Sequence, residues 1–543
     1  MKKLVKISLT FTLTLLLINN INAQDKSDWK GGVPEGCTSI TVGKLASDDG
    51  SVITSHTDDS HRTRSWMDIQ PAKDHAEGEM TPMFKRTADN TKAMPAYKHD
   101  KIGEIPQVKH TYQYINSAYP CMNDKQLGIG ESTFGGREEL QSDAGLIDCQ
   151  RLCQLMVERC TTARDAINMA GELVKKYGWN DYGECLTIAD PKEVWHFEIV
   201  GSGKDKVGAV WVAQRVPDDH ISVNVNASTI KEIDLSDKEH FMASENIYDV
   251  AKENGWWNEN ETFQFCYAYA PESRKSFAAR RREWRIFDLL APSLHLDPNA
   301  ENYPFSVKPD KKVSLENLVM AFKDYYEGTP YDMTRSIKST DKDGKTIISP
   351  LANPFMPYDQ LDISNVSGGW YSVNHENGKI DFLGERTIAR WYTMYATIIQ
   401  CRDWLPDEIG GVVWLAQDNV ATSIYVPVYC SATDLPKSYK TPGRVNGYTR
   451  ESAWWAFNRM GTLAAQRWGD TRHDVDAVWN PMQKEMFENQ EVFEEEALKL
   501  YNAKKPQKAI NYVTRYSNDK ANEVVEKAWE LGDFLWTKYD EKF

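Results

Sequence analysis

Apolar and polar residues alternate through residues 37–59, on both sides of the dipeptide Asp49-Gly50. This alternation is typical of a strand with one buried face, and Asp-Gly favours a tight hairpin turn between two such strands. We therefore predict a β-hairpin from Cys37 to about Asp59. Its closure would bring the end of the second strand beside the start of the first, with facing side chains roughly 5 Å apart.

Strand-like and helix-like segments alternate through the rest of the chain. Runs of six or more residues, mostly separated by Gly, Pro or Asp turns, predict strands at 184–189, 193–200, 209–215, 221–226, 364–374, 386–398 and 408–429. Apolar residues at helix spacing predict helices at 148–159 and 162–176, and the charged end of the chain, 451–543, is also helical in pattern. We predict an α+β fold with a compact domain over 37–440 and a helical C-terminal region over 441–543.

The N-terminus has the pattern of a signal peptide. Three lysines within the first six residues precede a mostly apolar run over 7–18, and Ala23-Gln24 offers a cleavage point after a small residue. A run of about 12 residues is shorter than the roughly 20 that span a bilayer, which disfavours an uncleaved anchor. We expect residues 1–23 to direct export to the periplasm or the cell exterior, and no membrane association after cleavage.

Composition narrows the partners and cofactors. The formal net charge of -15 disfavours nucleic acid and anionic membranes, because binding a polyphosphate needs clustered Lys and Arg. The nine cysteines form no CxxC pair and the 11 histidines do not cluster near them, so no metal site and no cofactor are predicted. An odd cysteine count in an exported protein leaves one thiol outside any set of disulfides, and the pairing of the others is not readable from sequence.

Cys37 directly follows a segment that reads as a removable linker. Residues 24–36 are polar, contain Gly and Pro, and show no periodicity. An inert, buried small residue is the commoner role of a cysteine that begins a strand. Cleavage before Cys37 would instead place a free α-amine, with an ordinary pKa of about 7.7–8.0, on the same residue as the thiol. That amine could then act as the base that activates the nucleophile, with an oxyanion hole for the attacked carbonyl.

The sequence resembles the cysteine dipeptidases of the N-terminal-nucleophile hydrolase superfamily, together with the secernins, and more distantly the penicillin V acylases and bile salt hydrolases. The resemblance rests on Cys37-Thr38-Ser39-Ile40, Asp49-Gly50-Ser51-Val52-Ile53, Asp58-Asp59, the block from Asn123 to Thr133, the segment from Gly183 to Gly203, and Val216-Pro217-Asp218-Asp219 with Asn226. It implies an αββα sandwich of stacked antiparallel sheets over residues 37 to about 440. It adds little for the C-terminal region.

The resemblance also implies roles for individual residues. Cys37 would be the nucleophile and its amine the base, with the carboxylate of Asp59 holding that amine. Asn226 would donate to the oxyanion, and Arg282 would lie near the nucleophile. Arg282 is the last of three consecutive arginines, which makes the alignment with the family uncertain by a few residues. Arg285 is therefore the alternative candidate for this role.

Three further residues are candidates for binding substrate. Asp58 would bind the substrate's amine, and a one-residue shift of the hairpin register would put it in the place of Asp59. His56 stands where the acylases have an arginine, which leaves its role beside the cysteine open. Thr133 would line the substrate pocket.

These features favour a secreted cysteine dipeptidase that acts on dipeptides or small amides. An N-acyl amide hydrolase of the penicillin V acylase or bile salt hydrolase type would use the same machinery. A non-catalytic exported protein that binds glycans through its 18 tryptophans is the alternative from another class. A homo-oligomer is compatible with all three, and the sequence does not fix the oligomeric state.

Overall fold

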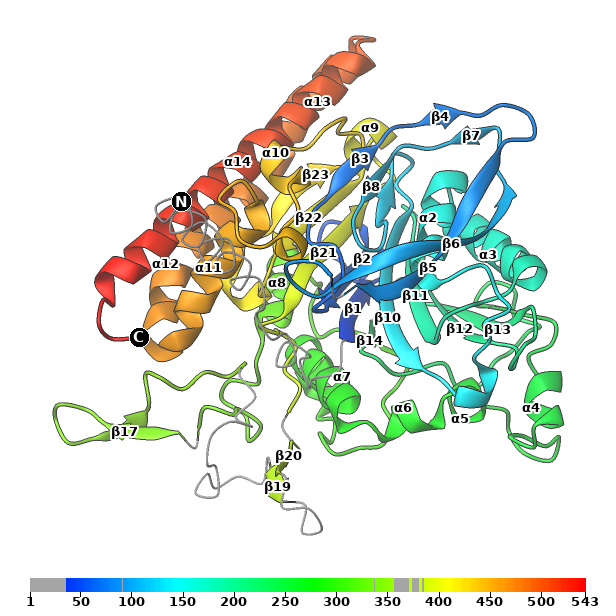
Figure 1. Cartoon of the computed structure of the whole chain (residues 1–543), viewed down its shortest axis with the longest axis horizontal. Helices are drawn as coiled ribbons and strands as arrows, with labels where there is room; N and C mark the ends of the chain where they lie inside the picture. The colour runs from blue at the N-terminus through cyan, green and yellow to red at the C-terminus, as the bar shows by residue number, and fades with distance from the viewer. Residues whose placement is uncertain (1–35, 90, 336, 356–370, 374–379, 383–384) are drawn as a thin grey trace, which may run out of the picture.

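Two antiparallel sheets form the centre of the protein (Figure 1). The computed structural model describes residues 36–89, 91–335, 337–355, 371–373, 380–382 and 385–543, so the predicted signal peptide and nearly all of the linker lie outside the described residues. In the first sheet the strands follow the order β16 (Ser306–Val307), β14 (Ile221–Asn224), β1 (Gly36–Val42), β2 (Val52–Asp59), β21 (Thr393–Cys401), β22 (Val412–Gln417) and β23 (Val426–Tyr429). In the second the order is β15 (Phe241–Ala243), β13 (Ala209–Arg215), β12 (Val194–Gly201), β11 (Gly183–Ala189), β10 (Gly128–Gly135), β9 (Met122–Asn123), β8 (Tyr114–Asn116) and β3 (Asp68–Gln70).

The two sheets stack face to face, with β1 and β2 against β10 and β11. Polar side chains bridge the interface: the Oγ1 atoms of Thr54 and Thr187 are 2.7 Å apart. The stacking is tight at Gly130, where a Cβ atom would lie only 2.4 Å from the carbonyl oxygen of Ser55. The first strand, β1, is therefore covered along its length, and all seven of its residues are buried.

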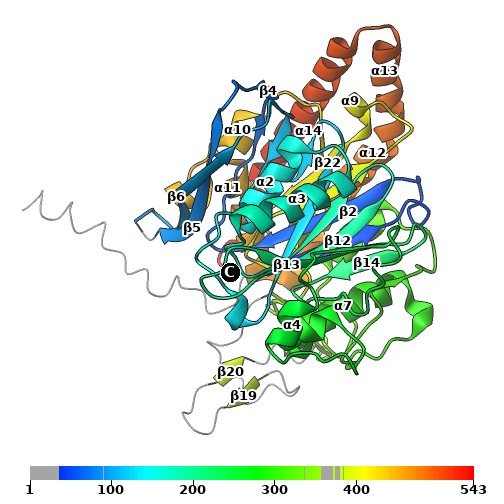
Figure 2. The same ribbon diagram turned by 90° about the vertical axis from the view of Figure 1, so that its right-hand side faces the viewer.

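Helices cover the outer face of the second sheet. There α2 (Cys149–Arg159) and α3 (Ala163–Tyr177) pair, and α3 packs on β11, β12 and β13 (Figure 2). Asp148 and Thr162 cap their N-termini by accepting from the backbone N–H groups of Arg151 and Asp165. These helices confirm the two predicted from apolar spacing.

The C-terminal region supplies the helices on the first sheet. It contains α11 (Ala453–Gln466), α12 (Trp468–Glu488), α13 (Gln490–Asn502) and α14 (Pro506–Lys538), the long red helix of Figure 1. Helix α14 packs on β23 and α11 packs on β22. The mixed helix and sheet class and the helical C-terminal region are thus confirmed, and the layers run helix, sheet, sheet, helix. The domain boundary at residue 440 stays a prediction.

The remaining helices and paired strands lie outside the two stacked sheets. The helices are α4 (Asp249–Glu253), α5 (Phe265–Tyr269), α6 (Pro271–Lys275), α7 (Phe277–Leu290), α8 (Leu315–Lys323), α9 (Asp407–Gly410) and α10 (Lys437–Lys440). Paired ribbons are formed by β4 (Lys73–Asp74) with β7 (His110–Thr111), β5 (Met80–Asp89) with β6 (Ala96–Pro106), β17 (Lys338–Thr340) with β18 (Thr346–Ile348), and β19 (Tyr371–Val373) with β20 (Ile380–Phe382). Within the described ranges, no helix is long and apolar enough to cross a membrane.

The predicted hairpin is present, but the prediction of a tight turn is wrong. Strands β1 and β2 pair as expected, yet residues 43–51 connect them instead of a tight turn at Asp49-Gly50. Tertiary contacts hold this longer connection open: the backbone N–H groups of Leu45 and Ala46 both donate to the carbonyl of Asp218. Gly50 keeps the left-handed conformation (φ 86°) that the dipeptide suggested.

The four strands predicted between 184 and 226 are confirmed as β11 to β14, although β14 belongs to the other sheet. The strand predicted over 386–398 is wrong at its start, because β21 begins only at Thr393. The preceding backbone is engaged elsewhere, with the N–H of Ala389 donating to the carbonyl of Asp324. The predicted segment 408–429 contains two strands, β22 and β23, and only β19 of the segment 364–374 lies within the described residues.

Candidate active site

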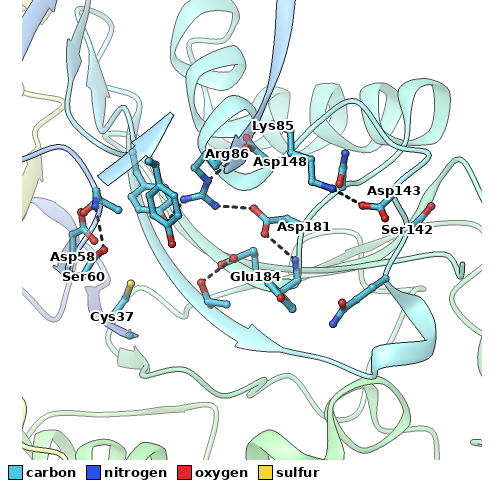
Figure 3. Close-up of a pocket in the computed structure, with 18 of the residues that line it drawn as sticks. Cys37, Asp58, Ser60, Lys85, Arg86, Ser142, Asp143, Asp148, Asp181 and Glu184 are labelled. Carbon is cyan, nitrogen blue, oxygen red and sulfur yellow. Dashed lines mark hydrogen bonds and ion pairs between the residues drawn. The ribbon is translucent and has the colours of Figure 1, made fainter. Parts of the chain in front are cut away.

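A cavity of about 630 Å³ opens at the N-terminal end of β1. Figure 3 shows the thiol of Cys37 and the carboxylate of Asp58 on one side of it, with Arg86, Asp181 and Glu184 further across. All nine cysteines of the chain are free and buried, and Cys37 is the one cysteine among the described residues that line this cavity. The sequence therefore places a single thiol where a small molecule could reach it.

The hairpin register decides which carboxylate faces the thiol. Cys37 pairs with Asp58, and Gly36 pairs with Asp59. Directly opposed residues of an antiparallel pair point to the same face, so Asp58 shares the face of Cys37. Its Oδ2 atom accepts a hydrogen bond from Thr63 Oγ1 at 2.7 Å. The sequence left open whether Asp58 or Asp59 faces the thiol. The register of the hairpin brings Asp58 there.

Asp59 also lines the cavity but is held by a different set of groups. It forms a buried ion pair with Arg386 and accepts a hydrogen bond from Thr393 Oγ1 at 2.6 Å. The neighbouring Gly36 has no room for a side chain, since a Cβ atom there would lie 2.7 Å from Asn226 Oδ1 and 3.1 Å from Arg386 Nη2. Asp59 therefore sits beside the Gly36–Cys37 bond, and its role in holding an amine there stays a prediction.

Asn226 and Arg282 converge on the backbone of Cys37. The Cys37 N–H donates to Asn226 Oδ1 at 3.0 Å, and Arg282 Nη1 donates to the Cys37 carbonyl at 2.6 Å. Arg282 Nη2 also donates to the Val225 carbonyl and to Asn226 Oδ1, both at 2.8 Å. Asn226 lies two residues after the end of β14 in a left-handed backbone conformation (φ 66°), and its Nδ2 donates to the Thr133 carbonyl of β10 at 2.7 Å. The structure thus brings both predicted residues to the cysteine.

The arginines on α7 contact different partners. Arg285, the alternative register, pairs with Asp288 and Asp324 and has no contact with Cys37. Arg281 pairs with Glu385. Of the arginines on α7, the structure brings Arg282 to the cysteine.

Glu131, which the sequence analysis missed, lies directly behind the thiol. Its strand, β10, belongs to the opposite sheet, and its Oε2 atom accepts a hydrogen bond from Cys37 Sγ at 3.2 Å. The same Oε2 lies 3.2 Å from Nε2 of the buried His56. Thr133 Oγ1 contacts Glu131 Oε1 at 3.1 Å and Glu184 Oε1 at 2.8 Å. His56 and Thr133 therefore both meet the nucleophile through Glu131.

The protonation of these groups follows from burial and mutual charge. Burial raises the pKa of the Cys37 thiol well above its usual value, and Glu131 raises it further because a negative charge opposes a thiolate. Burial also opposes ionisation of Glu131, yet His56 and Glu184 together hold the pKa of Glu131 at about 2. Burial and the charge of Glu131 raise the pKa of Glu184 well above its usual range. Of the two coupled glutamates, Glu131 is therefore the one that favours the ionised form, and the thiol of Cys37 favours the neutral form.

In the part of the chain that the structure describes, two groups of side chains have the donor atoms of a metal site. Cys37, His56 and Glu131 place one ligand atom each within 4.8 Å of one another, as do Glu131, Cys149 and Glu184. Thiolate, imidazole and carboxylate are ligands that zinc accepts. The prediction that the protein needs no metal stays a prediction.

The cavity is predominantly acidic. Its lining includes seven acidic residues (Asp58, Asp59, Asp143, Asp148, Asp181, Glu184 and Asp205) and three basic ones (Lys85, Arg86 and Lys204). Two of the bases are engaged: Arg86 Nη2 donates to Asp181 at 2.9 Å, and Lys85 pairs with Asp143. A cationic group on a small molecule is therefore favoured in this space.

Comparison with known proteins places this chain in a family. Residues 36–481 match the sequence model of peptidase family C69, so the chain belongs to this family and is a peptide-bond hydrolase. The resemblance drawn from the sequence is confirmed.

Its relatives cover most of the chain at low identity. A probable dipeptidase of Latilactobacillus sakei is 26% identical over 458 residues, which is 81% of this chain and 83% of the relative. Dipeptidase A of Lactobacillus helveticus is 22% identical over 521 residues, 93% of this chain and 98% of the relative. A probable dipeptidase of Salmonella dublin is 24% identical over 414 residues, with 72% and 80% coverage.

Replacement of Arg282 by lysine tests the contacts to the cysteine backbone. Arg282→Lys loses the forked donors that reach Cys37, Val225 and Asn226, and each lost bond to a charged group is worth about 1.5–3 kcal/mol. We expect the peptidase rate to fall about 10- to 100-fold. The measurement is kcat/KM with a peptide substrate, alongside a thermal melt.

Arg285→Lys is the matched control, since it changes the same residue type one turn along α7 and should stay within about threefold of wild type. Equal losses in both variants would contradict the assignment of Arg282.

Proposed function

We propose that this protein is an exported cysteine dipeptidase whose nucleophile, Cys37, becomes the N-terminal residue when the chain is cut after Gly36. Membership of peptidase family C69 and the dipeptidase names of its relatives support the reaction. The observation that carries the site is the thiol of Cys37 in an acidic cavity, with its backbone held by Asn226 and Arg282. The lysines and apolar run before residue 19 support export.

Removal of residues 1–36 would change the chemistry of the Cys37 nitrogen. As an amide it donates to Asn226 Oδ1 at 3.0 Å; as a free amine it would gain a basic lone pair at the same place. An amine with an ordinary pKa of about 7.7–8.0 can take the thiol proton at neutral pH and return it to the leaving amine. Asp59, beside the vacated position of Gly36, would hold that amine. One residue then supplies both nucleophile and base.

The attacked carbonyl needs donors for its developing charge. Asn226 Nδ2 carries two hydrogens, of which one is donated to the Thr133 carbonyl at 2.7 Å. The second hydrogen is the proposed oxyanion donor. Arg282 supports this arrangement by fixing the Asn226 side chain at Oδ1. The thioester formed on Cys37 would then be hydrolysed by water.

The stacked sheets between helical layers are consistent with an N-terminal-nucleophile hydrolase of the αββα type. In such a fold the nucleophile begins a central strand, and here β1 lies between β14 and β2 with Cys37 as its second residue. We include this fold assignment in the proposal.

Mass analysis of the expressed full-length chain tests the processing. We expect active protein to begin at Cys37 and to fractionate outside the cytoplasm. Cys37→Ser should retain the fold and lose at least 100-fold in dipeptide hydrolysis, because a hydroxyl is a far weaker nucleophile than a thiol under the same amine. Fully active protein that still begins near Gln24 would refute the proposal.

The substrate amine provides a second test. Asp58 shares the face of the thiol, so it is placed to pair with a dipeptide's ammonium group. We expect free dipeptides to be hydrolysed at least 100-fold faster than their N-acetylated forms. Asp58→Asn should raise KM for dipeptides about 10- to 100-fold and leave the slow N-acetyl reaction nearly unchanged. If N-acetylated substrates react as fast as free dipeptides, the enzyme is an acyl amide hydrolase and the dipeptidase assignment is wrong.

A further inference from the structure

A second cavity, of about 690 Å³, lies between α8, the segment that follows it and α12. Among the described residues, it shares no lining residue with the cavity at Cys37. One part of its wall is apolar and is formed by Val319, Met320, Ala421, Trp468 and Phe487. Such a wall favours a small molecule that has an apolar part.

Most of the charged side chains on the wall already have partners or face water. The ion pairs are Asp324 with Arg285, Arg472 with Glu327, and Lys484 with Glu488. Glu316 and His473 are exposed. The half-buried Lys323 of α8 and Asp476 of α12 are different, because neither forms a hydrogen bond or an ion pair with any residue that the structure describes.

Lys323 and Asp476 influence each other without bonding. Burial lowers the pKa of Lys323, and the charge of Asp476 opposes that shift. Burial likewise raises the pKa of Asp476, and the charge of Lys323 opposes it. The two side chains therefore lie near each other across the cavity, and each loses hydration that no protein group replaces.

This pair of charges selects the chemistry of a ligand. A simple anion would pair with Lys323 but would be repelled by Asp476, and a simple cation would meet the reverse arrangement. A neutral apolar molecule would leave both charges unpaired. A zwitterion satisfies both, because its carboxylate can pair with Lys323 and its ammonium group with Asp476 while an apolar side chain packs on the apolar wall.

We propose that the cavity between α8 and α12 is a second binding site of this protein, which takes a small zwitterion with an apolar side chain. A free apolar amino acid and a short apolar peptide share this chemistry. In the proposed function they are a product and a substrate of the enzyme. The second site stands on its own lining residues, so it does not require that the proposed function is correct.

Photo-leucine, a leucine analogue with a diazirine in its side chain, tests the site directly. When it is irradiated with the purified full-length protein, we expect peptide mapping to find the label on α8 or α12, and L-leucine to compete with it. Leucyl-leucine, added to the Cys37→Ser variant so that it is not hydrolysed, is the second competitor. The stronger of the two competitors identifies the amino acid or the peptide as the preferred ligand.

Analogues that carry a single charge test the zwitterion. 4-Methylpentanoate lacks the ammonium group and 3-methylbutylamine lacks the carboxylate, so each should compete at least about tenfold more weakly than L-leucine. This comparison uses the unaltered protein, so it decides the question even if a variant fails to fold.

Variants test the two side chains. Lys323→Met and Asp476→Asn should each lower the labelling of α8 and α12 at least about tenfold. Lys311→Met and Asp474→Asn are the matched controls, since Lys311 is exposed outside the cavity and Asp474 of α12 pairs with Lys538. Labelling of both controls should stay within about twofold of wild type.

Three results would overturn the inference. The first is label that is confined to the cavity at Cys37, or that L-leucine does not displace from α8 and α12. The second is equal competition by L-leucine and the two analogues of single charge, which would make the cavity a general apolar pocket. The third is wild-type labelling of folded Lys323→Met and Asp476→Asn. Dipeptide hydrolysis by the same samples tests the proposed function separately.

Discussion

The bonds that Arg282 makes to the backbone around Cys37 hold the candidate site together. This arginine projects from α7 and donates to the carbonyls of Cys37 and Val225 and to Asn226 Oδ1. Burial, and then the nearby charge of Arg386, lower the pKa of Arg282 well below its usual value, a sign of how costly this cation is in the interior. The bonds offset that cost, and they fix the start of β1 relative to the end of β14.

The candidate site also depends on the stacking of the two sheets. The thiol belongs to β1 in one sheet and Glu131 to β10 in the other, and their contact exists only because β10 packs on β1 and β2. The glycine at 130, one residue before Glu131, allows that approach. Inside such an interface, water does not screen charges, so the ionised Glu131 acts strongly on the thiol and on Glu184. In this buried network, the ionisation of one group therefore opposes the ionisation of its neighbours.

Local sequence patterns predicted the parts of this site that lie close along the chain. Alternation through residues 37–59 predicted a hairpin that returns Asp58 and Asp59 beside Cys37, but it left open which of the two faces the thiol. The family resemblance gave Asn226 and Arg282. The patterns failed where distant segments decide the outcome. The connection over 43–51 is held open by Asp218, and the strand expected from 386 begins late because its backbone bonds to Asp324.

Arg386 shows what a single sequence does not reveal. Arg386 reaches Asp59 across 327 positions, and no local pattern encodes that pair. Glu131 did leave a signal: it stands in Gly128-Ile129-Gly130-Glu131-Ser132, where small and apolar neighbours predict a buried strand. A charge in such a strand is costly unless it is paired or functional, so it marks a candidate site residue.

In the proposed function, Cys37 is both the terminal residue and the reactive thiol of the cavity. A chloromethyl ketone that carries a free α-amine tests it, because a thiolate displaces the chloride and keeps the label. Peptide mapping of the inactivated enzyme should find one label per chain, on a Cys37 that begins the chain, in proportion to the activity lost. Inactivation with the label on any of the other eight cysteines, or on a Cys37 still joined to Gly36, would contradict this role of Cys37.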